Sequence, residues 1–368
     1  MENAQMNYGH KLKNYCAAIL CFGCGVLLQS ITGQTQVIEE DHQWKVQGIS
    51  VPATLLRPES AGKYPAIIFV AGSGPTDRNW NSPGLKGSNG SARLLAEGLS
   101  DLGMITIRYD KRVSGPLSIR KVNAKLLAGN LTMQGHVDEL AGAYQVLKAH
   151  PNVDVSKILV FGHSEGTLHS LAYQVSHDKD DRFAGLILAG VLGRPVYEIL
   201  KSQVGPQIEK FPDGRKLKTK IFKAIDDIRD GKTEVNLKGV PEVFRNVIES
   251  FLHKDGRPFI YEFLRAEPLE DFSKVDEPIL VMIGKKDIQV KWNEDGKLLE
   301  DAVTPSQKVT FSYPKNANHV LKHYKKRIKS SSSDDLISGY NGEGTYLDPE
   351  AWEVIVNWLK ANDWLMEK

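Results

Sequence analysis

Cysteine is scarce in this sequence, and its few cysteines all lie near the N-terminus. The 368 residues include only Cys16, Cys21 and Cys24, inside one apolar stretch. Cys21 and Cys24 have the spacing of a metal or redox pair, but no second pair of ligands exists, which argues against such a site. A chain cleaved after this stretch would have no disulfide. That fits an exported bacterial protein, periplasmic or secreted, better than a eukaryotic extracellular one.

The apolar stretch itself, residues 15–28, is too short to span a bilayer comfortably. Lys11 and Lys13 precede it, and the small and polar residues 30–36 follow it. These three parts are typical of a secretory signal peptide. We therefore predict a signal peptide over residues 1–33 and no stable membrane insertion after its removal. An uncleaved membrane anchor is the alternative.

Excess charge, internal repeats and long low-complexity tracts are also missing. The formal net charge is +2, with 41% hydrophobic and 25% charged residues. This composition is typical of a soluble globular enzyme. Without a strong global field, the chain is not expected to bind nucleic acid or an anionic membrane. The oligomeric state stays open.

The most informative feature that is present is a glycine-rich turn around Ser164. A strand-like apolar run leads into Gly-His-Ser-Glu-Gly at residues 162–166, and a helical pattern follows at residues 167–173. This is G-x-S-x-G in the strand–turn–helix context of a nucleophile elbow. Gly162 and Gly166 have no Cβ, so the strand and helix can pass close together. We expect the turn to strain the serine backbone and expose its hydroxyl.

Strand-like and helix-like segments alternate along most of the chain. Residues 44–57 predict two antiparallel strands, and continuous apolar runs predict further strands at residues 65–71, 104–109, 158–161, 183–189, 278–284 and 309–313. Amphipathic periodicity predicts helices at residues 92–102, 134–150 and 351–360, the last with Asp348 as its cap and Pro349 in its first turn. The alternation is typical of an α/β fold with a mostly parallel sheet and helices on both faces.

Residues 193–273 follow a different pattern. Their apolar residues recur at helical spacing in residues 196–204, 217–228 and 243–252, and no strand-like run interrupts them. The sequence therefore predicts a helical insertion between two parts of one core, residues 34–192 and 274–368.

A serine hydroxyl needs a base and an orienting acid to become a nucleophile. In a sheet of this type the order along the chain is serine, acid, histidine, with the last two beyond later strands. Asp287 follows the strand at 278–284, and His319 follows the strand at 309–313. Singly, each is more often a turn or loop residue, but together with Ser164 they predict a catalytic triad. Other acids are weaker candidates, being in a helix or before the strand: Asp271, Asp276 and Asp295.

A tetrahedral intermediate requires hydrogen-bond donors for its negative oxygen. We expect these oxyanion-hole donors to be the backbone N–H groups of Glu165, directly after the nucleophile, and of Ser73, after the strand at residues 65–71. Gly72 and Gly74 would let this loop approach a substrate closely. The loop lacks the lysine of a phosphate-binding loop, which disfavours that alternative. The helix dipole alone explains a carboxylate at residue 165.

Three further features have simple explanations. His163 is expected to pack or form hydrogen bonds rather than serve as a second base. His323 follows His319 at a helical metal-binding spacing, but no acidic third ligand is evident, and we expect no metal and no cofactor. The basic segment from Lys322 to Lys329 is expected to be a solvated loop, although its place after His319 would suit an anionic substrate group.

Three motifs stand out beyond these single residues. They are Ala-Gly-Ser-Gly-Pro-Thr-Asp-Arg at residues 71–78, Arg-Tyr-Asp-Lys-Arg at residues 108–112 and the Gly-His-Ser-Glu-Gly turn. In all three the chain, from about Trp44 onward, resembles the bacterial serine esterases of the α/β-hydrolase superfamily. It departs from them at residues 113–116, Val-Ser-Gly-Pro, where they have Gly-x-Gly-x-Ser.

The resemblance implies an α/β-hydrolase fold in which residues 193–273 form a lid over the site. It also implies hydrolysis of a small-molecule ester by Ser164, Asp287 and His319, with water as the second substrate. A peptidase, amidase or acyltransferase on the same triad is an alternative. A non-catalytic binding protein on a hydrolase scaffold is another, although such proteins usually lose a triad member. The acyl and alcohol groups stay open, because the insertion has no readable motif.

Overall fold

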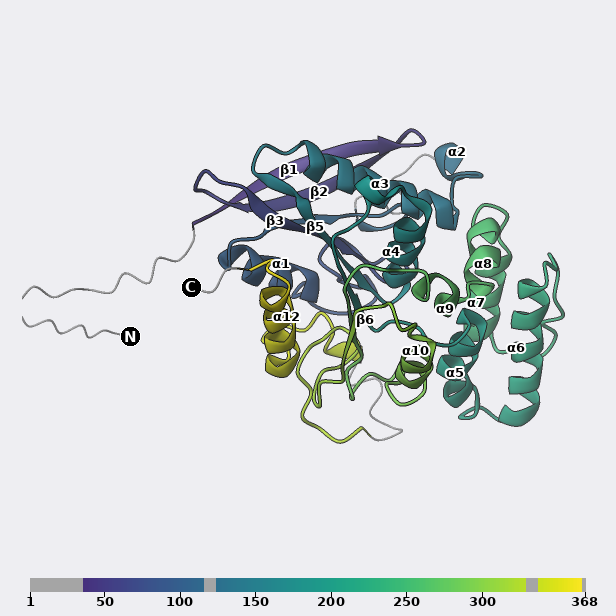
Figure 1. Cartoon of the computed structure of the whole chain (residues 1–368). Helices are drawn as coiled ribbons and strands as arrows, with labels where there is room; N and C mark the ends of the chain where they lie inside the picture. The colour runs from purple at the N-terminus through teal and green to yellow at the C-terminus, as the bar shows by residue number, and fades with distance from the viewer. Residues whose placement is uncertain (1–35, 116–123, 329–336, 366–368) are drawn as a thin grey trace, which may run out of the picture. The chain divides into compact units, whose positions relative to one another are not determined.

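An eight-stranded sheet forms the centre of the computed structural model, which describes residues 36–115, 124–328 and 337–365 (Figure 1). The strand order is β1-β2-β4-β3-β5-β6-β7-β8. The β1–β2 and β2–β4 pairs are antiparallel, and all other neighbours are parallel. The predicted mostly parallel sheet with helices on both faces is confirmed. The predicted signal peptide and its cysteines lie outside the described residues.

The strands are β1 (Val37–Val46), β2 (Ile49–Pro58), β3 (Tyr64–Val70), β4 (Ile105–Tyr109), β5 (Val153–His163), β6 (Leu186–Ala189), β7 (Ile279–Met282) and β8 (Val309–Ser312). The helices around them are α1 (Ser91–Asp101), α2 (Ala124–Leu127), α3 (Met133–Ala149), α4 (Glu165–Ser176), α10 (Asp295–Ala302) and α12 (Pro349–Ala361). Within the described ranges, no helix has both the length and the hydrophobicity that crossing a bilayer requires.

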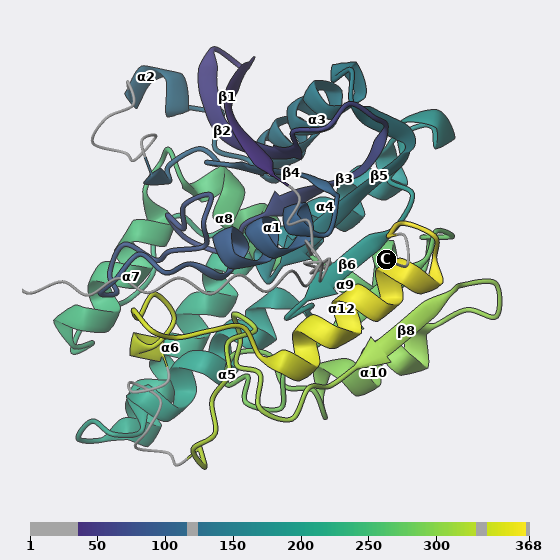
Figure 2. The same ribbon diagram turned by 90° about the vertical axis from the view of Figure 1, so that its left-hand side faces the viewer.

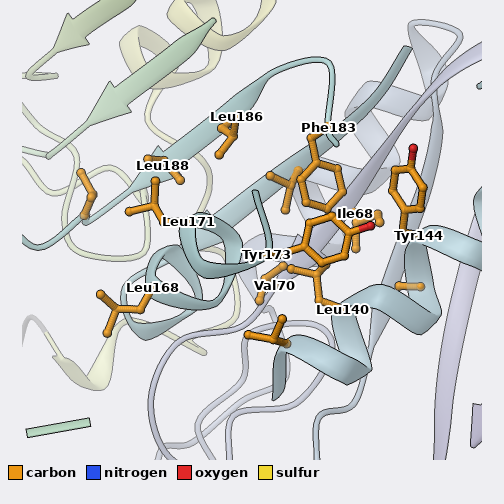
Figure 3. Close-up of a cluster of buried hydrophobic side chains, with 14 of the residues drawn as sticks. Ile68, Val70, Leu140, Tyr144, Leu168, Leu171, Tyr173, Phe183, Leu186 and Leu188 are labelled. Carbon is orange, nitrogen blue, oxygen red and sulfur yellow. The ribbon is translucent and has the colours of Figure 1, made fainter. Parts of the chain in front are cut away.

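Alternate side chains of β3 enter two separate apolar layers. Ile68 packs into one layer with Leu140 of α3 and Leu171 of α4 (Figure 3). Ile67 belongs to the other layer with Leu99 of α1, on the side where α1 and α12 lie (Figure 2). A strand covered on both faces is apolar throughout, and each buried aliphatic side chain stabilises the fold by about 1.5–3 kcal/mol. This packing fixes the strand ends on which the site is built.

Five helices lie between β6 and β7: α5 (Val196–Ile208), α6 (Gly214–Arg229), α7 (Glu242–Leu252), α8 (Arg257–Leu264) and α9 (Pro268–Phe272). Residues 193–273 are all described and contain no strand. Helices α8 and α9 were not expected; α8 has eight residues and α9 five, and such short segments carry little periodic signal. Helices α5 to α8 share an apolar core of their own, whereas Phe272 of α9 belongs to the core of the sheet. The residues of the helical core are Ile208, Leu217, Ile221, Ile225, Ile248 and Leu264.

Two boundaries show how side chains decide where elements begin and end. The strand expected at residues 183–189 is limited to Leu186–Ala189. Phe183 N–H instead donates to the side chain of Gln174 at 3.0 Å. At the last helix, the Asp348 carboxylate accepts the N–H of Ala351 at 3.1 Å, which confirms the predicted cap.

Candidate active site

The backbone is strained at Ser164, the single residue between the end of β5 and the start of α4. Its φ of 51° and ψ of −122° lie outside the regions that L-residues favour. Such a conformation persists only where surrounding contacts hold it. Here the N–H of Ser164 donates to the carbonyl of Ala189 at 2.9 Å, and its own carbonyl accepts the N–H of Thr167 at 2.9 Å. The elbow is therefore fixed from both sides.

Gly162 and Gly166 allow β5 and α4 to meet around this turn. A Cβ on Gly162 would lie 2.7 Å from Oγ of Ser170, and a Cβ on Gly166 would lie 2.4 Å from the carbonyl oxygen of Val70. Both distances are too short for a real side chain without movement of the neighbours. The close passage of strand and helix is the physical reason for both glycines.

Asp287 and His319 meet beyond the ends of β7 and β8. The Nδ1 of His319 lies 2.7 Å from Oδ2 of Asp287, and both side chains are buried. Because a carboxylate accepts hydrogen bonds, Nδ1–H is the donor, and Nε2 of the neutral ring has no proton. The other carboxylate oxygen accepts the N–H groups of Gln289 at 2.8 Å and Val290 at 3.0 Å. The imidazole is thus held in one tautomer by a fixed acid.

Gly190, directly after β6, forms the floor under this imidazole. Its φ is 58°, and a Cβ there would lie 3.0 Å from Cε1 of His319 and 3.7 Å from Oδ2 of Asp287. Glycine accepts this left-handed backbone without cost and leaves room for the ring. Gly190 was not predicted as a site residue. Its position directly after a buried strand is the signal that could have identified it.

Ser164 and His319 line one small cavity of about 80 Å³, together with Gly72 and Ser73. A Cβ on Gly72 would lie 3.1 Å from Cβ of Ser164, so the loop after β3 lies directly against the nucleophile elbow. Asp287 adjoins the cavity through its bond to His319. The structure therefore brings the three predicted triad residues and Ser73 to one place, from four separate strand ends.

The backbone N–H groups of Ser73 and Glu165 are the two expected oxyanion-hole donors. Glu165 is the first residue of α4, where an N–H has no intrahelical acceptor. Across the described part of the chain, neither N–H donates to another protein group. Gly74 has a φ of 74° and open space at its Cβ position, so its requirement is conformational rather than steric.

A second, larger cavity of about 1090 Å³ adjoins the first. Ser82, Gln289 and Tyr340 line both cavities. The apolar part of its lining consists of Leu85, Pro206, Ile288, Ile328 and Ile337. Helix α5 supplies one wall, so the insertion borders the larger of the two adjoining cavities.

His163 packs and forms a hydrogen bond, as expected. Its ring stacks on Trp80 with the ring centroids 4.6 Å apart, and its Nε2 lies 2.9 Å from the carbonyl oxygen of His319. A carbonyl only accepts, so Nε2 carries the proton. Burial, and then the nearby His319 ring, lower the pKa of His163 to about 3. The neutral ring supports the backbone of His319.

A cluster of buried charges that was not predicted from the sequence includes Glu165, the residue directly after Ser164. The Nζ of Lys111 lies 2.7 Å from Oε1 of Glu165, and Nε2 of His169 lies 3.3 Å from the same oxygen. Burial alone would raise the pKa of the Glu165 carboxyl, but Lys111 and then His169 hold it well below its usual value. Burial lowers the pKa of His169 to about 4.

The residues on either side of Lys111 are paired as well. Arg112 donates to Glu139 of α3 at 2.7 Å, and Nδ1 of His136 lies 3.2 Å from that carboxylate. Asp110 accepts from Arg78 at 2.8 Å. Each residue of the Asp-Lys-Arg motif after β4 therefore pairs with a different part of the fold. Three charged residues directly after a buried strand were the signal for this cluster.

His136, Glu165 and His169 place their ligand atoms within 4.8 Å of one another, close enough to hold a metal ion. The Lys111 ammonium already balances the charge of the Glu165 carboxylate. A divalent cation there would be repelled by this ammonium at short range. We therefore assign the cluster to charge balance.

The expectation of a solvated basic loop is wrong for Lys322. This side chain is 1% exposed, and its Nζ donates to the carbonyls of Asn89 and Tyr340 and to Oγ1 of Thr345. Burial lowers the pKa of Lys322 to about 8. His323 does not share a site with His319; its Nδ1 lies 2.6 Å from Oδ2 of Asp348, the helix cap. Lys329 lies outside the described residues.

The architecture defines the class of protein: the chain has the α/β-hydrolase fold. A putative dienelactone hydrolase of Klebsiella pneumoniae superposes with a TM-score of 0.50 at 12% identity, covering 89% of this chain and 99% of its own. The structure of VinJ superposes with a TM-score of 0.51 at 14% identity, covering 88% of this chain and 98% of its own. At these identities the likeness establishes the fold alone.

Esterase EstD of Thermotoga maritima is a relative at the level of sequence. It is 24% identical over 283 residues, which are 77% of this chain and 60% of EstD. The chain thus spans about three fifths of the length of this relative. No family model matches the sequence.

Proposed function

We propose that this protein is a serine hydrolase that cleaves carboxylic esters through an acyl-enzyme. The observation that carries the proposal is the bond of 2.7 Å between His319 and Asp287, with His319 and the strained Ser164 lining the same cavity. The sequence similarity to Esterase EstD supports an ester as the substrate class.

The proposed reaction begins when Oγ of Ser164 attacks the ester carbonyl and Nε2 of His319 takes its proton. Asp287 stabilises the imidazolium that forms. The N–H groups of Ser73 and Glu165 would bind the negative oxygen, and each such donor is worth roughly 2.7–4 kcal/mol in the transition state. His319 then protonates the leaving alcohol and activates water, which releases the acid and restores Ser164.

The two adjoining cavities support a division of the substrate. The small cavity next to Ser164 has room for the reacting ester group, and the larger one, with its apolar lining, has room for a bulky apolar part. Because α5 supplies a wall of the larger cavity, we propose that residues 193–273 act as a lid that shapes the substrate site.

A variant of the nucleophile tests the proposal. Ser164→Ala should abolish hydrolysis of p-nitrophenyl esters and covalent labelling by a fluorophosphonate, while its thermal unfolding stays close to that of the wild type. Ser156→Ala, which changes an exposed serine, is the matched control and should keep both reactions. Rates on matched amides would separate an esterase from a peptidase. A wild-type chain that neither labels nor turns over would be a binding protein instead.

We also propose that the chain is exported, to the periplasm or outside the cell, with residues 1–33 acting as a signal peptide. Support comes from the sequence pattern alone. Fractionation of expressing cells and N-terminal sequencing of the exported product test this. A product in the cytoplasm that still begins at residue 1 would contradict it.

A further inference from the structure

Lys111 contacts both halves of the proposed oxyanion hole. Its Nζ donates to the carbonyl oxygen of Gly72 at 2.6 Å and to Oε1 of Glu165 at 2.7 Å. We propose that Lys111 is a positioning residue, which fixes the two N–H donors of the oxyanion hole through one buried ammonium group. The inference rests on the proposed function and adds to it a residue that does not touch the substrate.

The contact with Gly72 acts on a single peptide unit. The carbonyl of Gly72 and the N–H of Ser73 belong to the same planar peptide, in which they point in opposite directions. An ammonium that holds this carbonyl therefore also sets the direction of the N–H of Ser73. A charged donor on the oxygen also polarises the amide, which strengthens its N–H as a donor. Ser73 itself is exposed, so packing of its side chain does not orient this N–H in place of the contact with Lys111.

The contact with Glu165 acts on the second donor. Glu165 is 2% exposed, and its carboxylate also accepts from His169 one helical turn later. The side chain is thereby fixed to both α4 and the loop after β4. The backbone N–H of the same residue is the other proposed donor. Lys111 thus connects the loop after β3 to the start of α4 on the buried side of the cavity.

A neutral side chain at position 111 could not replace these contacts. Lys111 is 5% exposed, and among the described residues the Glu165 carboxylate is the one acid that pairs with its charge. Removing one partner of such a pair leaves the other charge buried and unpaired, which destabilises the fold by itself. An informative test must therefore separate the loss of the pair from the loss of the contact with Gly72.

The test compares Lys111→Met with the double variant Lys111→Met/Glu165→Gln, which has no unpaired charge. The readouts are kcat/KM for a p-nitrophenyl ester, its pH profile and Ki values for two inhibitors. The first inhibitor is an alkyl trifluoromethyl ketone, whose adduct with Ser164 would carry an oxyanion. The second is the matching methyl ketone, which is bound without that charge. Lys148→Met, at a surface ion pair, is the control.

For both variants we expect kcat/KM to fall by about tenfold to hundredfold, less than the roughly 10²–10³-fold effect of losing a donor outright. The Ki of the trifluoromethyl ketone should rise by the same factor. The Ki of the methyl ketone and the pH profile should not move, because His319 is untouched. The double variant should regain thermal stability but not activity. A merely structural lysine would leave the two ketones affected alike.

The inference is overturned if the double variant has wild-type kcat/KM and a wild-type Ki for the trifluoromethyl ketone. If Lys111→Met does not fold, the double variant alone decides between the two outcomes. Failure of the proposed function is a separate result: a wild-type protein that neither hydrolyses esters nor binds the trifluoromethyl ketone more tightly than the methyl ketone.

Discussion

Carboxylates and histidines meet in two places beside Ser164, and the two arrangements differ in whether the histidine reaches a cavity. On one side, His319 bonds to Asp287 through Nδ1 and lines the cavity, so its other nitrogen is available to a substrate. On the other side, His169 bonds to Glu165 inside a cluster that includes Lys111, with every member buried. The same residue types thus form two different arrangements. His319 can still contact a substrate, whereas His169 lies in a buried cluster in which Lys111 balances the charge of Glu165.

The difference follows from what surrounds each carboxylate. Asp287 accepts two backbone N–H groups and one imidazole, and no lysine or arginine in the described ranges forms an ion pair with it. Its charge remains available to stabilise an imidazolium. The charge of Glu165 is already balanced by Lys111. The proposed catalytic role therefore rests on the access of His319 to the cavity as well as on its pairing with Asp287.

The largest expected effect comes from changing the pair of Asp287 and His319. Asp287→Asn keeps the shape of the side chain but favours the wrong tautomer of His319, and kcat/KM should fall by about 10⁴-fold. Steady-state kinetics on a p-nitrophenyl ester measure this, with thermal unfolding as the check on folding. A fall of less than tenfold would mean that His319 does not depend on Asp287.

The next largest effect comes from changing the buried ion pair of Glu139 and Arg112. Glu139→Ala would leave Arg112 buried without its partner, and the free energy of unfolding should fall by about 3–5 kcal/mol. Urea unfolding measures the loss, and kcat/KM per folded molecule should stay near the wild-type value. Glu139→Gln, which keeps one acceptor oxygen for Arg112, is the matched control and should lose less. Equal stability of wild type and Glu139→Ala would contradict the role of the buried charge cluster in stabilising the fold.

The buried histidines should make the fold sensitive to acid. His163, with a pKa of about 3, and His169, with a pKa of about 4, have values in the folded state below the usual 6.5. Between these values the unfolded chain binds protons that the folded chain does not, so stability falls as pH falls. Each histidine contributes roughly 1.4 kcal/mol per pH unit. The lowered pKa of Glu165 acts in the same direction at lower pH.

Urea midpoints measured from about pH 7 down to about pH 4.5 test this dependence. His169→Gln removes one of the two groups, so its slope should be shallower by about one proton. A wild-type midpoint that is constant over this range would show that these rings are already able to take up protons in the folded state.

The smallest effect is expected at the surface. Lys148 lies 2.6 Å from Asp181, but the two side chains are 40% and 37% exposed. Lys148→Met should change the free energy of unfolding far less than Glu139→Ala does, because water screens such a pair. Urea unfolding beside Glu139→Ala makes the comparison between exposed and buried pairs direct. A loss as large as that of Glu139→Ala would contradict it.

The sequence contained most of the sheet and the local geometry of the elbow. Continuous apolar runs indicated the parallel strands, and the motif around Ser164 indicated a strand–turn–helix unit. Both signals are local, because they depend on neighbours in the chain. Asp287 and His319 were predicted because each follows a predicted strand. That prediction required only the order of the strands along the chain.

The buried charges could not be read in the same way. Lys111 is separated from Glu165 by 54 positions, and no local pattern says which charges become partners. Lys322 belongs to a run of basic residues that is typical of a solvated loop, yet its ammonium is held by carbonyls from distant segments. Long-range pairing depends on the completed fold, and for that reason the cluster of charges beside Ser164 was missed.

The apolar core shared by helices α5 to α8 has a practical consequence for protein engineering. Gln203, Pro206 and Gln207 of α5 face the large cavity, whereas the residues that hold the inserted helices together are others. Substituting Pro206 and Gln207 would reshape the chamber and keep the hydrogen bond that Gln203 donates to the carbonyl of Gln289, beyond β7, at 3.3 Å. A combinatorial library at these sites would therefore diversify selectivity on a scaffold that stays intact.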